Sequence, residues 1–389
     1  MSSSFQLPDL LGLTGSFELR TNRHCRFVTD ASEKWFQELP EGVLTAEESA
    51  RYKPTKAGLL AALCFPTCDL PQLRLLTDFL FVLIVCHERV MGALSPADCG
   101  WVTHEMDEDP DPVQCLTKHA VFGHLVPSFS KLVDPQKVRK DWSTRFCLAF
   151  HNYHSGQVEL VASNSDLKAH GKSSTLDQGA DAFLELRRKV GGWDILFLLH
   201  EALEDIRYEG ATDQELDTLE EIMASTGDTL SWILDIAAYN ADQSHNNPHN
   251  LISVFMSRNH LSLQGAINYA ANQIKKRLSS LESMESLLFS PNSDSRSRPH
   301  HSLAAWLPLQ LNWTSAPAMT KNPTHMDPRP PEALEDLRSV VQNRKDSIVG
   351  VSNWIYETEL YFGTKGEEVR IFGWVFLTPP AVPETMTGN

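Results

Sequence analysis

The sequence lacks the marks of a secreted, disulfide-bonded or membrane-spanning protein. Its seven cysteines are an odd number, and none stands in a C-x-x-C pair or in the Cys/His spacing of a zinc site. We therefore expect buried thiols in a reducing compartment. The first residues lack the basic region and apolar core of a signal peptide, and the longest apolar run, 79–86, is too short to cross a bilayer. These absences predict a cytoplasmic protein without membrane insertion.

Basic residues are also in short supply. The 34 lysines and arginines stand against 50 acidic residues, which gives a net charge of −16. An acidic surface repels nucleic acid and anionic membranes, so neither is an expected partner, and an anionic ligand needs a local basic cluster. The chain has no G-x-G-x-x-G, Walker A or G-x-S-x-G motif. His200-Glu201 lacks the second histidine, four residues on, of a zinc protease helix.

Helical periodicity is what the chain has in abundance. With 42% hydrophobic residues in 389, it can bury a large core. Strand-like alternation is confined to 369–377, and Thr226-Gly227-Asp228 is a candidate helix cap or break. Apolar residues at three- and four-residue spacing predict helices over 58–64, 72–92, 142–162, 180–206, 214–240, 261–289 and 333–362.

We predict one all-α domain of about ten helices over residues 21–366. It contains an irregular stretch, 291–331, rich in Pro, Ser, Asn and His. An irregular connection of this length inside a domain is typical of a lid or a disordered segment. Residues 1–20 are expected to form a flexible N-terminus, and 367–389 a C-terminal tail.

The segment 232–251, WILDIAAYNADQSHNNPHNL, carries the first candidate chemistry. Asp235 and Asp242 are seven residues apart, so they share one face of a helix and could together hold one metal ion. A charged pair on a helix more often faces solvent. Against this, the helix is apolar on both sides, at Trp232, Ile233, Ile236 and Ala237. Both interpretations stay open.

Short segments in a fixed order along almost the whole chain point to a known family. They are Asn22-x-His24 with Ser32-x-x-Trp35, Gly58-Leu-Leu-Ala-Ala-Leu63 with Phe65-Pro66, Arg74-Leu75-x-x-Asp78-Phe79, Arg145-Phe146 with Phe150 and Tyr153, Arg187-Arg188-x-x-Gly191-Gly192, Leu261-Ser262-Leu263-Gln264, and Trp354-x-x-Glu357-Thr358-x-x-Tyr361-Phe362-Gly363. Together with 232–251, they resemble the fungal class I terpene cyclases, or sesquiterpene synthases. The resemblance implies the class I terpenoid synthase helical bundle.

In that family, Mg²⁺ ions bridge two carboxylate-rich helices to the diphosphate of a prenyl substrate. Basic side chains take up charge as the allylic C–O bond breaks, and an apolar cavity then folds the carbocation. Hard Mg²⁺ prefers oxygen ligands, which is why carboxylates fill these positions. The resemblance thus implies Mg²⁺ as cofactor and a prenyl diphosphate as small-molecule partner, and it is compatible with a homodimer.

Both metal motifs depart from the family pattern. The aspartate-rich motif, Asp-Glu-x-x-Asp, reads His87-Glu88-Arg89-Val90-Met91, and the second motif has Leu234 for Asn, Ala238 for Ser and Asp242 for Glu. The remaining candidate metal ligands are Glu88, Asp235 and Asp242, which favours fewer than three ions. His87, if protonated, would pair with diphosphate. The alternative for 87–89 is a solvated helix end.

Candidate diphosphate-binding groups are partly kept. Arg188 lies 46 positions before Leu234 (234 minus 188), which resembles the family's sensor arginine, with Arg187 beside it. Gly192 fits a helix break that offers a carbonyl to the leaving group, and Tyr361 supplies a hydroxyl. The family's Lys and Arg are replaced by Ala241 and Leu360. Compensation from the basic run that contains Lys275, Lys276 and Arg277 is the hypothesis, against a solvated face; for Arg188 the alternative is a structural salt bridge.

The same resemblance predicts the pocket walls. Trp354 occupies the position of a cation-stabilising aromatic, whose ring face attracts positive charge, although a core aromatic is the alternative. The other predicted wall residues are Leu80, Leu83, Ile84, Leu234 and Ala238.

Two functional hypotheses follow from these observations. The first is a sesquiterpene cyclase that ionises farnesyl diphosphate. Degenerate motifs of this kind resemble humulene-forming cyclases of fungal tropolone sesquiterpenoid pathways, so humulene is the product suggested by resemblance. The second is a protein that no longer ionises: a terpenoid-binding pseudoenzyme, or an acid-base cyclase or isomerase acting on a diphosphate-free terpenoid. The lost basic residues favour the second hypothesis, and the retained Arg188, Asp235, Asp242 and Tyr361 favour the first.

Overall fold

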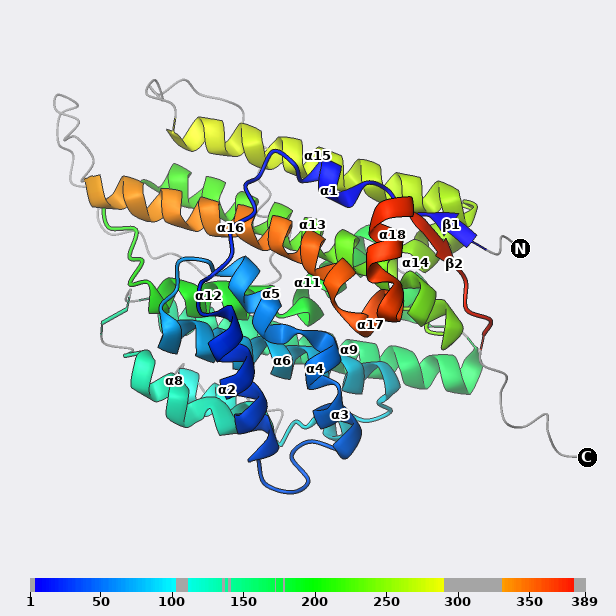
Figure 1. Ribbon diagram of the computed structural model, residues 1–389, viewed down its shortest axis with the longest axis horizontal. Coiled ribbons are helices and arrows are strands. Elements are labelled where there is room, and N and C mark those ends of the chain that lie inside the picture. Colours follow the sequence, from blue (N-terminus) through cyan, green and yellow to red (C-terminus); the bar gives the residue numbers. More distant parts are fainter. Residues whose placement is uncertain are drawn as a thin grey trace, which may run out of the picture.

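The predicted all-α architecture is confirmed. The computed structural model describes residues 4–102, 111–134, 137–138, 141–171, 173–177, 179–289 and 331–380, and these are mainly helical (Figure 1). The predicted irregular stretch 291–331 lies outside them except for its last residue. The elements are β1 (Ser4–Gln6), α1 (Leu10–Leu13), α2 (Cys25–Gln37), α3 (Ala46–Ala50), α4 (Tyr52–Thr55), α5 (Ala57–Cys64), α6 (Leu70–Gly92), η1 (Pro96–Cys99), α7 (Pro112–Thr117), η2 (Phe122–Leu125), α8 (Val126–Leu132), α9 (Trp142–His170), α10 (Ser174–Asp177), α11 (Ala180–Gly191), α12 (Trp193–Leu203), α13 (Asp213–Ser244), α14 (Leu251–Arg258), α15 (Leu263–Phe289), α16 (Pro331–Glu357), α17 (Glu359–Phe362), η4 (Gly363–Lys365), α18 (Gly366–Phe372) and β2 (Trp374–Phe376).

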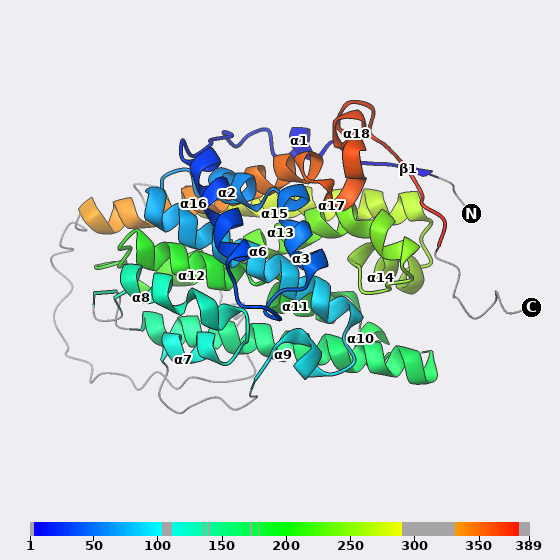
Figure 2. The same cartoon turned by 60° about the horizontal axis from the view of Figure 1, so that its bottom comes forward.

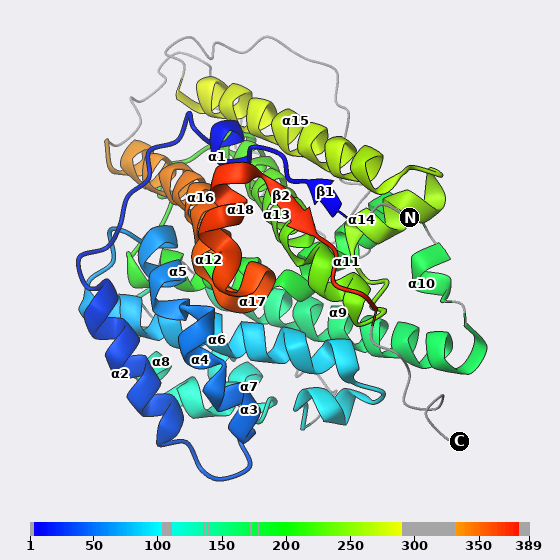
Figure 3. The ribbon, with the colours of Figure 1, turned by 45° about the vertical axis from the view of Figure 1, so that its right-hand side comes forward.

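The long helix α13 organises the packing. It lies beside α15 and α16 in Figures 1 and 3, and it also contacts α11, α14 and α17. On the other side of α11 lies α9, which packs against α12 and α6 as well and runs along one edge of the molecule in Figure 2. Residues from α6, α11, α13 and α17 are therefore brought towards one another.

Helix α6 shows how local sequence and burial agree. Asp69 and Gln72 form a reciprocal capping box at its start, with a proline in the first turn. The stretch Leu70–Met91 is long and apolar enough to cross a membrane, but its most apolar part is mostly buried inside the protein. It is therefore accounted for as a core helix.

The predicted helix 180–206 is two helices. It divides at Gly192, whose φ of +67° lies in the left-handed region that L-residues avoid. A Cβ built on Gly192 would lie 2.4 Å from a methyl carbon of Leu83 on α6. Glycine is thus required twice here, for the break between α11 and α12 and for the approach of α6.

By contrast, Thr226-Gly227-Asp228 does not interrupt α13. The helix runs unbroken from Asp213 to Ser244, and the Thr226 hydroxyl donates to the Ile222 carbonyl at 2.8 Å. A threonine that bonds back four residues is compatible with a helix interior.

The two ends of the described chain are held together. Residues predicted as a flexible N-terminus instead form β1, which pairs antiparallel with β2 from the predicted C-terminal tail (Figure 3). Phe5 and Leu10 are buried. Only part of the alternating stretch 369–377 is a strand, because α18 continues to Phe372 and Gly373, with a φ of +71°, ends it.

We expect Gly192→Ala to destabilise the protein by about 2–5 kcal/mol, since it adds both backbone strain and overlap with Leu83. Gly171→Ala is the matched control: its φ is +68°, but no atom of the described residues lies within 4 Å of the added methyl group, so strain alone should cost about 1–2 kcal/mol. Urea unfolding measures both free energies, and equal losses would contradict the steric argument.

Candidate active site

The site is built on one half-buried face of α13. Leu234, Ala238 and Asp242 occur at four-residue spacing, so they lie above one another on that face. All three are half-buried, whereas Asp235 and Ile236 beside them are buried. The positions that correspond to the family's second metal motif thus present two apolar side chains and one carboxylate.

Asp235 is committed to holding the helices together. One carboxylate oxygen accepts from Arg187 of α11, and the other accepts the Leu251 amide at 2.8 Å. The Asn250 side chain donates to the Asp235 backbone carbonyl, also at 2.8 Å. Burial raises the pKa of Asp235, against the opposing effect of the Arg187 charge. Its two oxygens are therefore both occupied inside the protein.

Asp242 is held by neutral groups instead. Its oxygens accept from the side-chain amides of Asn247, at 3.0 Å, and Asn250, at 2.8 Å. Burial raises the pKa of Asp242 to about 6, and the nearby Asp235 charge adds to the rise. Amide donors stabilise a carboxylate less than a guanidinium does, so Asp242 carries a charge that the protein compensates poorly.

Arg187 lies at the centre of this polar group. Its Nε atom is buried and has no hydrogen-bond partner among the described residues. Burial lowers the pKa of His87 and of His249, and the Arg187 charge adds to both shifts. The same charge opposes the burial and the Asp242 charge that raise the pKa of Tyr361. Residues of α6, α11, α13 and α17 thus act on one another electrostatically, as a shared site requires.

His87 differs from the protonated group that the sequence analysis considered. Burial, helped by the Arg187 charge, lowers the pKa of His87 to about 3, so the imidazole is neutral at ordinary pH. Its neighbour Glu88 forms an ion pair with Arg51 at 2.7 Å. The motif position on α6 therefore presents a neutral imidazole and an already paired carboxylate.

Arg188 forms a salt bridge within the protein, which the sequence analysis gave as the alternative to diphosphate binding. It makes a two-pronged contact with Asp228 of α13, in which Nη2 lies 2.9 Å from Oδ2. Arg277 of α15 also binds this carboxylate, at 2.7 Å. Lys275 and Lys276, the predicted diphosphate ligands, are exposed on α15 and are not brought to this group. Arg277 is the member of the basic run that reaches the interior.

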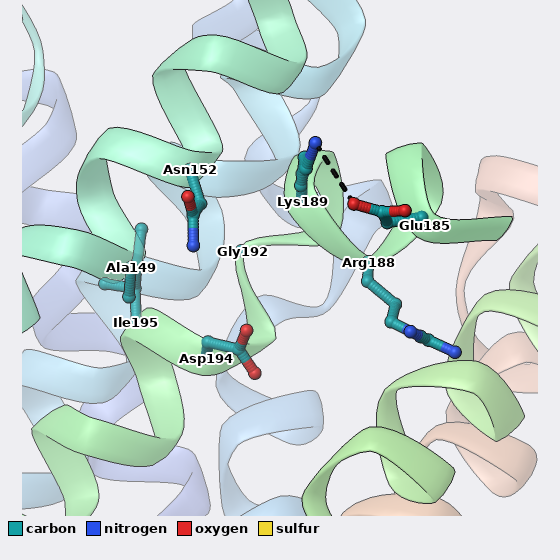
Figure 4. Close-up of a pocket in the computed structure, with 8 residues that line it drawn as sticks. All are labelled: Ala149, Asn152, Glu185, Arg188, Lys189, Gly192, Asp194 and Ile195. Carbon is teal, nitrogen blue, oxygen red and sulfur yellow. Dashed lines mark ion pairs between the residues drawn. The ribbon is translucent and has the colours of Figure 1, made fainter. Parts of the chain in front are cut away.

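A small pocket lies beside Arg188, between α9 and the break of α11 and α12. Its volume is about 130 Å³, well below the roughly 300 Å³ at the lower end of ligand cavities. Asp194 points into the space below Asn152, while the Arg188 guanidinium turns away from both (Figure 4). The other lining residues are Ala149, Glu185, Lys189, Gly192 and Ile195. The pocket is too small for a prenyl chain.

The predicted wall residues lie in two places: Leu83 of α6 lies beside Gly192, whereas Trp354 of α16 lies beside Tyr361. Leu83 packs directly against Gly192, as its contact with a built Cβ shows, and Leu80 is buried one turn before it. Ile84 is half-buried. Trp354 is buried, its indole N–H donates to the Thr55 carbonyl at 2.9 Å, and it meets Tyr361 edge to face. Trp354 therefore stands behind Tyr361 and supports it.

The carboxylates present do not fit a cluster of three magnesium ions. Among the described residues, Glu88, Asp235 and Asp242 do not form a group with ligand atoms within 4.8 Å of one another. Asp235 and Glu88 are paired with arginines. Asp242 alone of the three is bonded only to neutral amides, so a single cation on Asp242 is the arrangement that these residues fit.

Comparisons with known proteins agree with this geometry. Residues 105–280 match the family described as terpene synthase family 2, C-terminal metal binding. Sesquiterpene synthase Agr1 of Cyclocybe aegerita is 24% identical to the chain, over 96% of this chain and 93% of that protein. The alpha-muurolene synthase of Coprinopsis cinerea is 23% identical, over 98% of this chain and 79% of that protein. The chain is thus similar to fungal sesquiterpene synthases along nearly its whole length.

The same fold is found in solved terpene synthases. The crystal structure of an α-eudesmol synthase has a TM-score of 0.58 at 17% identity, and the match covers 91% of this chain and 99% of that one. The family's description includes metal binding, which implies a divalent cation. The chain keeps the fold of these proteins while it presents few of the metal ligands that the resemblance implies.

The raised pKa of Asp242 predicts a pH effect on stability. Because the folded-state pKa, about 6, exceeds the ordinary value of 3.8, the folded protein binds the proton more tightly than the unfolded chain. This stabilisation is complete below about pH 4 and is lost as pH rises through 6. Relative to Asp242→Asn, we expect the parent to lose on the order of 1–2 kcal/mol over that window. Denaturant unfolding at several pH values checks this, and parallel curves would contradict it.

Proposed function

We propose that the protein is a sesquiterpene cyclase that ionises farnesyl diphosphate and cyclises the carbocation to a hydrocarbon. The observation that carries the proposal is the placement of charge along α13, where a net positive group and a partly uncompensated carboxylate flank an apolar stretch. Full-length similarity to sesquiterpene synthases supports the substrate class.

The diphosphate is assigned to Arg188 and Arg277. These two guanidinium groups share the single carboxylate of Asp228, so the group carries a net positive charge. Both arginine side chains are about one-third exposed, at 35% and 34%, which leaves N–H donors accessible. Around Arg187, in contrast, the two carboxylates of Asp235 and Asp242 face one guanidinium, so that group carries a net negative charge. An anion is therefore bound better at Arg188 and Arg277.

A divalent cation, which we take to be Mg²⁺, is assigned to Asp242. When bound there, it would neutralise the carboxylate of Asp242, whereas the charge of a diphosphate at Arg188 and Arg277 would be compensated by those guanidinium groups and by cations that the substrate carries with it. Asp228 and Asp242 are 14 residues apart on α13, about 21 Å along its axis. The cation therefore serves the end of the site away from the Arg188 group, next to Tyr361, whose hydroxyl is a further donor.

The prenyl chain is assigned to the apolar face between these charges. Leu234 and Ala238 replace metal ligands of the family, and they extend the apolar surface of α13. As the C–O bond breaks, its electron pair leaves with the diphosphate. The allylic carbocation that remains closes a ring over these side chains. Loss of a proton to a base ends the reaction, and the neutral imidazole of His87 is suited to accept it. Humulene, an eleven-membered ring with few later cation shifts, is the product we propose.

The alternative is a terpenoid-binding protein that no longer ionises its ligand. The pairing of Asp235 and Glu88 with arginines favours it, because a carboxylate that is bound to an arginine is not available as a metal ligand. An acid-base role for His87 as proton donor is not favoured, since the imidazole is neutral. Asp242, with a pKa of about 6, is the better proton donor in that case.

One assay separates the two functions. Purified protein is incubated with farnesyl diphosphate, with and without Mg²⁺, and volatile hydrocarbons and released diphosphate are measured. The proposal expects both products, with a cyclic hydrocarbon that depends on the cation. Absence of diphosphate release under every condition would refute the cyclase and leave the binding protein.

Adjacent residues of α15 test the diphosphate assignment. Arg277→Gln should lower the rate of diphosphate release by roughly 10- to 1000-fold, because one charge-assisted donor is lost. Lys276→Gln removes the same charge from the next position, which is exposed, and should leave the rate close to the parent's. If the two variants behave alike in single-turnover assays, the anion lies elsewhere.

A further inference from the structure

A second group of metal-ligand side chains lies at the other end of α12 from Gly192. Cys68, His200 and Glu204 each offer one ligand atom, and these atoms lie within 4.8 Å of one another. Cys68 comes from the connection between α5 and α6, whereas His200 is in the last turn of α12 and Glu204 is its C-cap. Four residues separate His200 from Glu204, so the two side chains share one helix face.

The histidine of this group is buried without a hydrogen-bond partner in the part of the chain that the structure describes. His200 is 1% exposed, and neither ring nitrogen has a hydrogen-bond partner among the described residues. Its ring lies against Phe65, with 5.3 Å between centroids. A buried imidazole normally bonds through at least one nitrogen, so an orphaned pair calls for an explanation such as a bound ion.

The backbone around the group is fixed in place. Asn22 donates to the carbonyls of Phe65, at 3.1 Å, and of Cys68, at 2.7 Å. The Gln72 side chain donates to the Leu203 carbonyl at 2.6 Å, which ties the start of α6 to the end of α12. The three donors are therefore held by a rigid frame, as a metal site requires.

We propose that Cys68, His200 and Glu204 form a binding site for a zinc ion or a similar borderline divalent cation. A thiolate, an imidazole and a carboxylate are a donor set typical of zinc, and a half-buried Glu204 leaves room for water as fourth ligand. Binding replaces the thiol proton of Cys68, which is released to solvent. The ion would join the α5–α6 connection to α12, and it would bind one of the two unpartnered ring nitrogens of His200.

This site is separate from the one assigned to the terpene chemistry. Gly192 and His200 are eight residues apart, about 12 Å along the helix axis. Hard Mg²⁺ disfavours thiolate and imidazole ligands, so the cation proposed at Asp242 is not a competitor here. The inference also needs no prenyl diphosphate and does not depend on the proposed function.

Zinc and cobalt alone are the probes. The metal-free protein, prepared with chelator under reducing conditions, is titrated with Co²⁺, and the sulfur-to-cobalt charge-transfer absorption is recorded. Zn²⁺ is then added to displace it. We expect one cobalt ion per chain to give this band, Zn²⁺ to remove it, and Zn²⁺ to raise the melting temperature.

Three variants keep the test decisive. Cys68→Ser should abolish the charge-transfer band, and Cys64→Ser, a buried cysteine four residues earlier whose thiol faces the Ser347 carbonyl, should retain it. Glu204→Gln is half-buried and expected to fold, and it should weaken cobalt binding at least about 10-fold. A parent without the band, or a Cys68→Ser variant that keeps it, overturns the proposal.

Discussion

The buried ion pair between Arg187 and Asp235 is the interaction on which the site depends. It joins α11 to α13, and through the Leu251 amide and Asn250 it also fixes the start of α14. Removal of one member of such a pair typically costs about 3–5 kcal/mol, because the other charge is left buried and alone. The pair therefore orients the helices, and it does so by using a carboxylate that would otherwise be available to a metal.

Three carboxylates lie at seven-residue spacing along α13, and the number of positive charges bound to each falls along the helix. Asp228 has two arginines, Asp235 has one, and Asp242 has only amides. The helix thus changes from net positive to net negative surroundings along one face. A ligand with an anionic head would be oriented by that gradient, with its head towards Asp228.

Much of the fold could be predicted from the sequence, because long helices with regular apolar spacing dominate it. Helices α6, α13 and α15 lie close to the predicted ranges. The break at Gly192 was missed by periodicity, which continues through it, although the resemblance suggested a break there. The N-terminal segment was predicted as flexible, since three residues of strand pairing with a distant segment leave almost no local pattern.

The site was less predictable, because its geometry depends on contacts between distant residues. Arg187 and Arg188 are neighbours in sequence but diverge by about 100° around the helix, so one meets Asp235 and the other Asp228. Nothing local distinguishes Arg277 from Lys276. The sequence around His200 was dismissed for lack of a second histidine, yet the glutamate at that very spacing, Glu204, lies next to a cysteine 136 positions earlier (204 minus 68).

The pairing of β1 with β2 also constrains the order of folding. Ser4 is matched with Phe376, a separation of 372 positions (376 minus 4). Contacts of such long range are slow to form, because the intervening chain must first be ordered. During synthesis, Phe5 has no strand partner until residues 374–376 have been made. The first segment of the described chain to be synthesised is therefore among the last to settle, and its docking marks the completion of the domain.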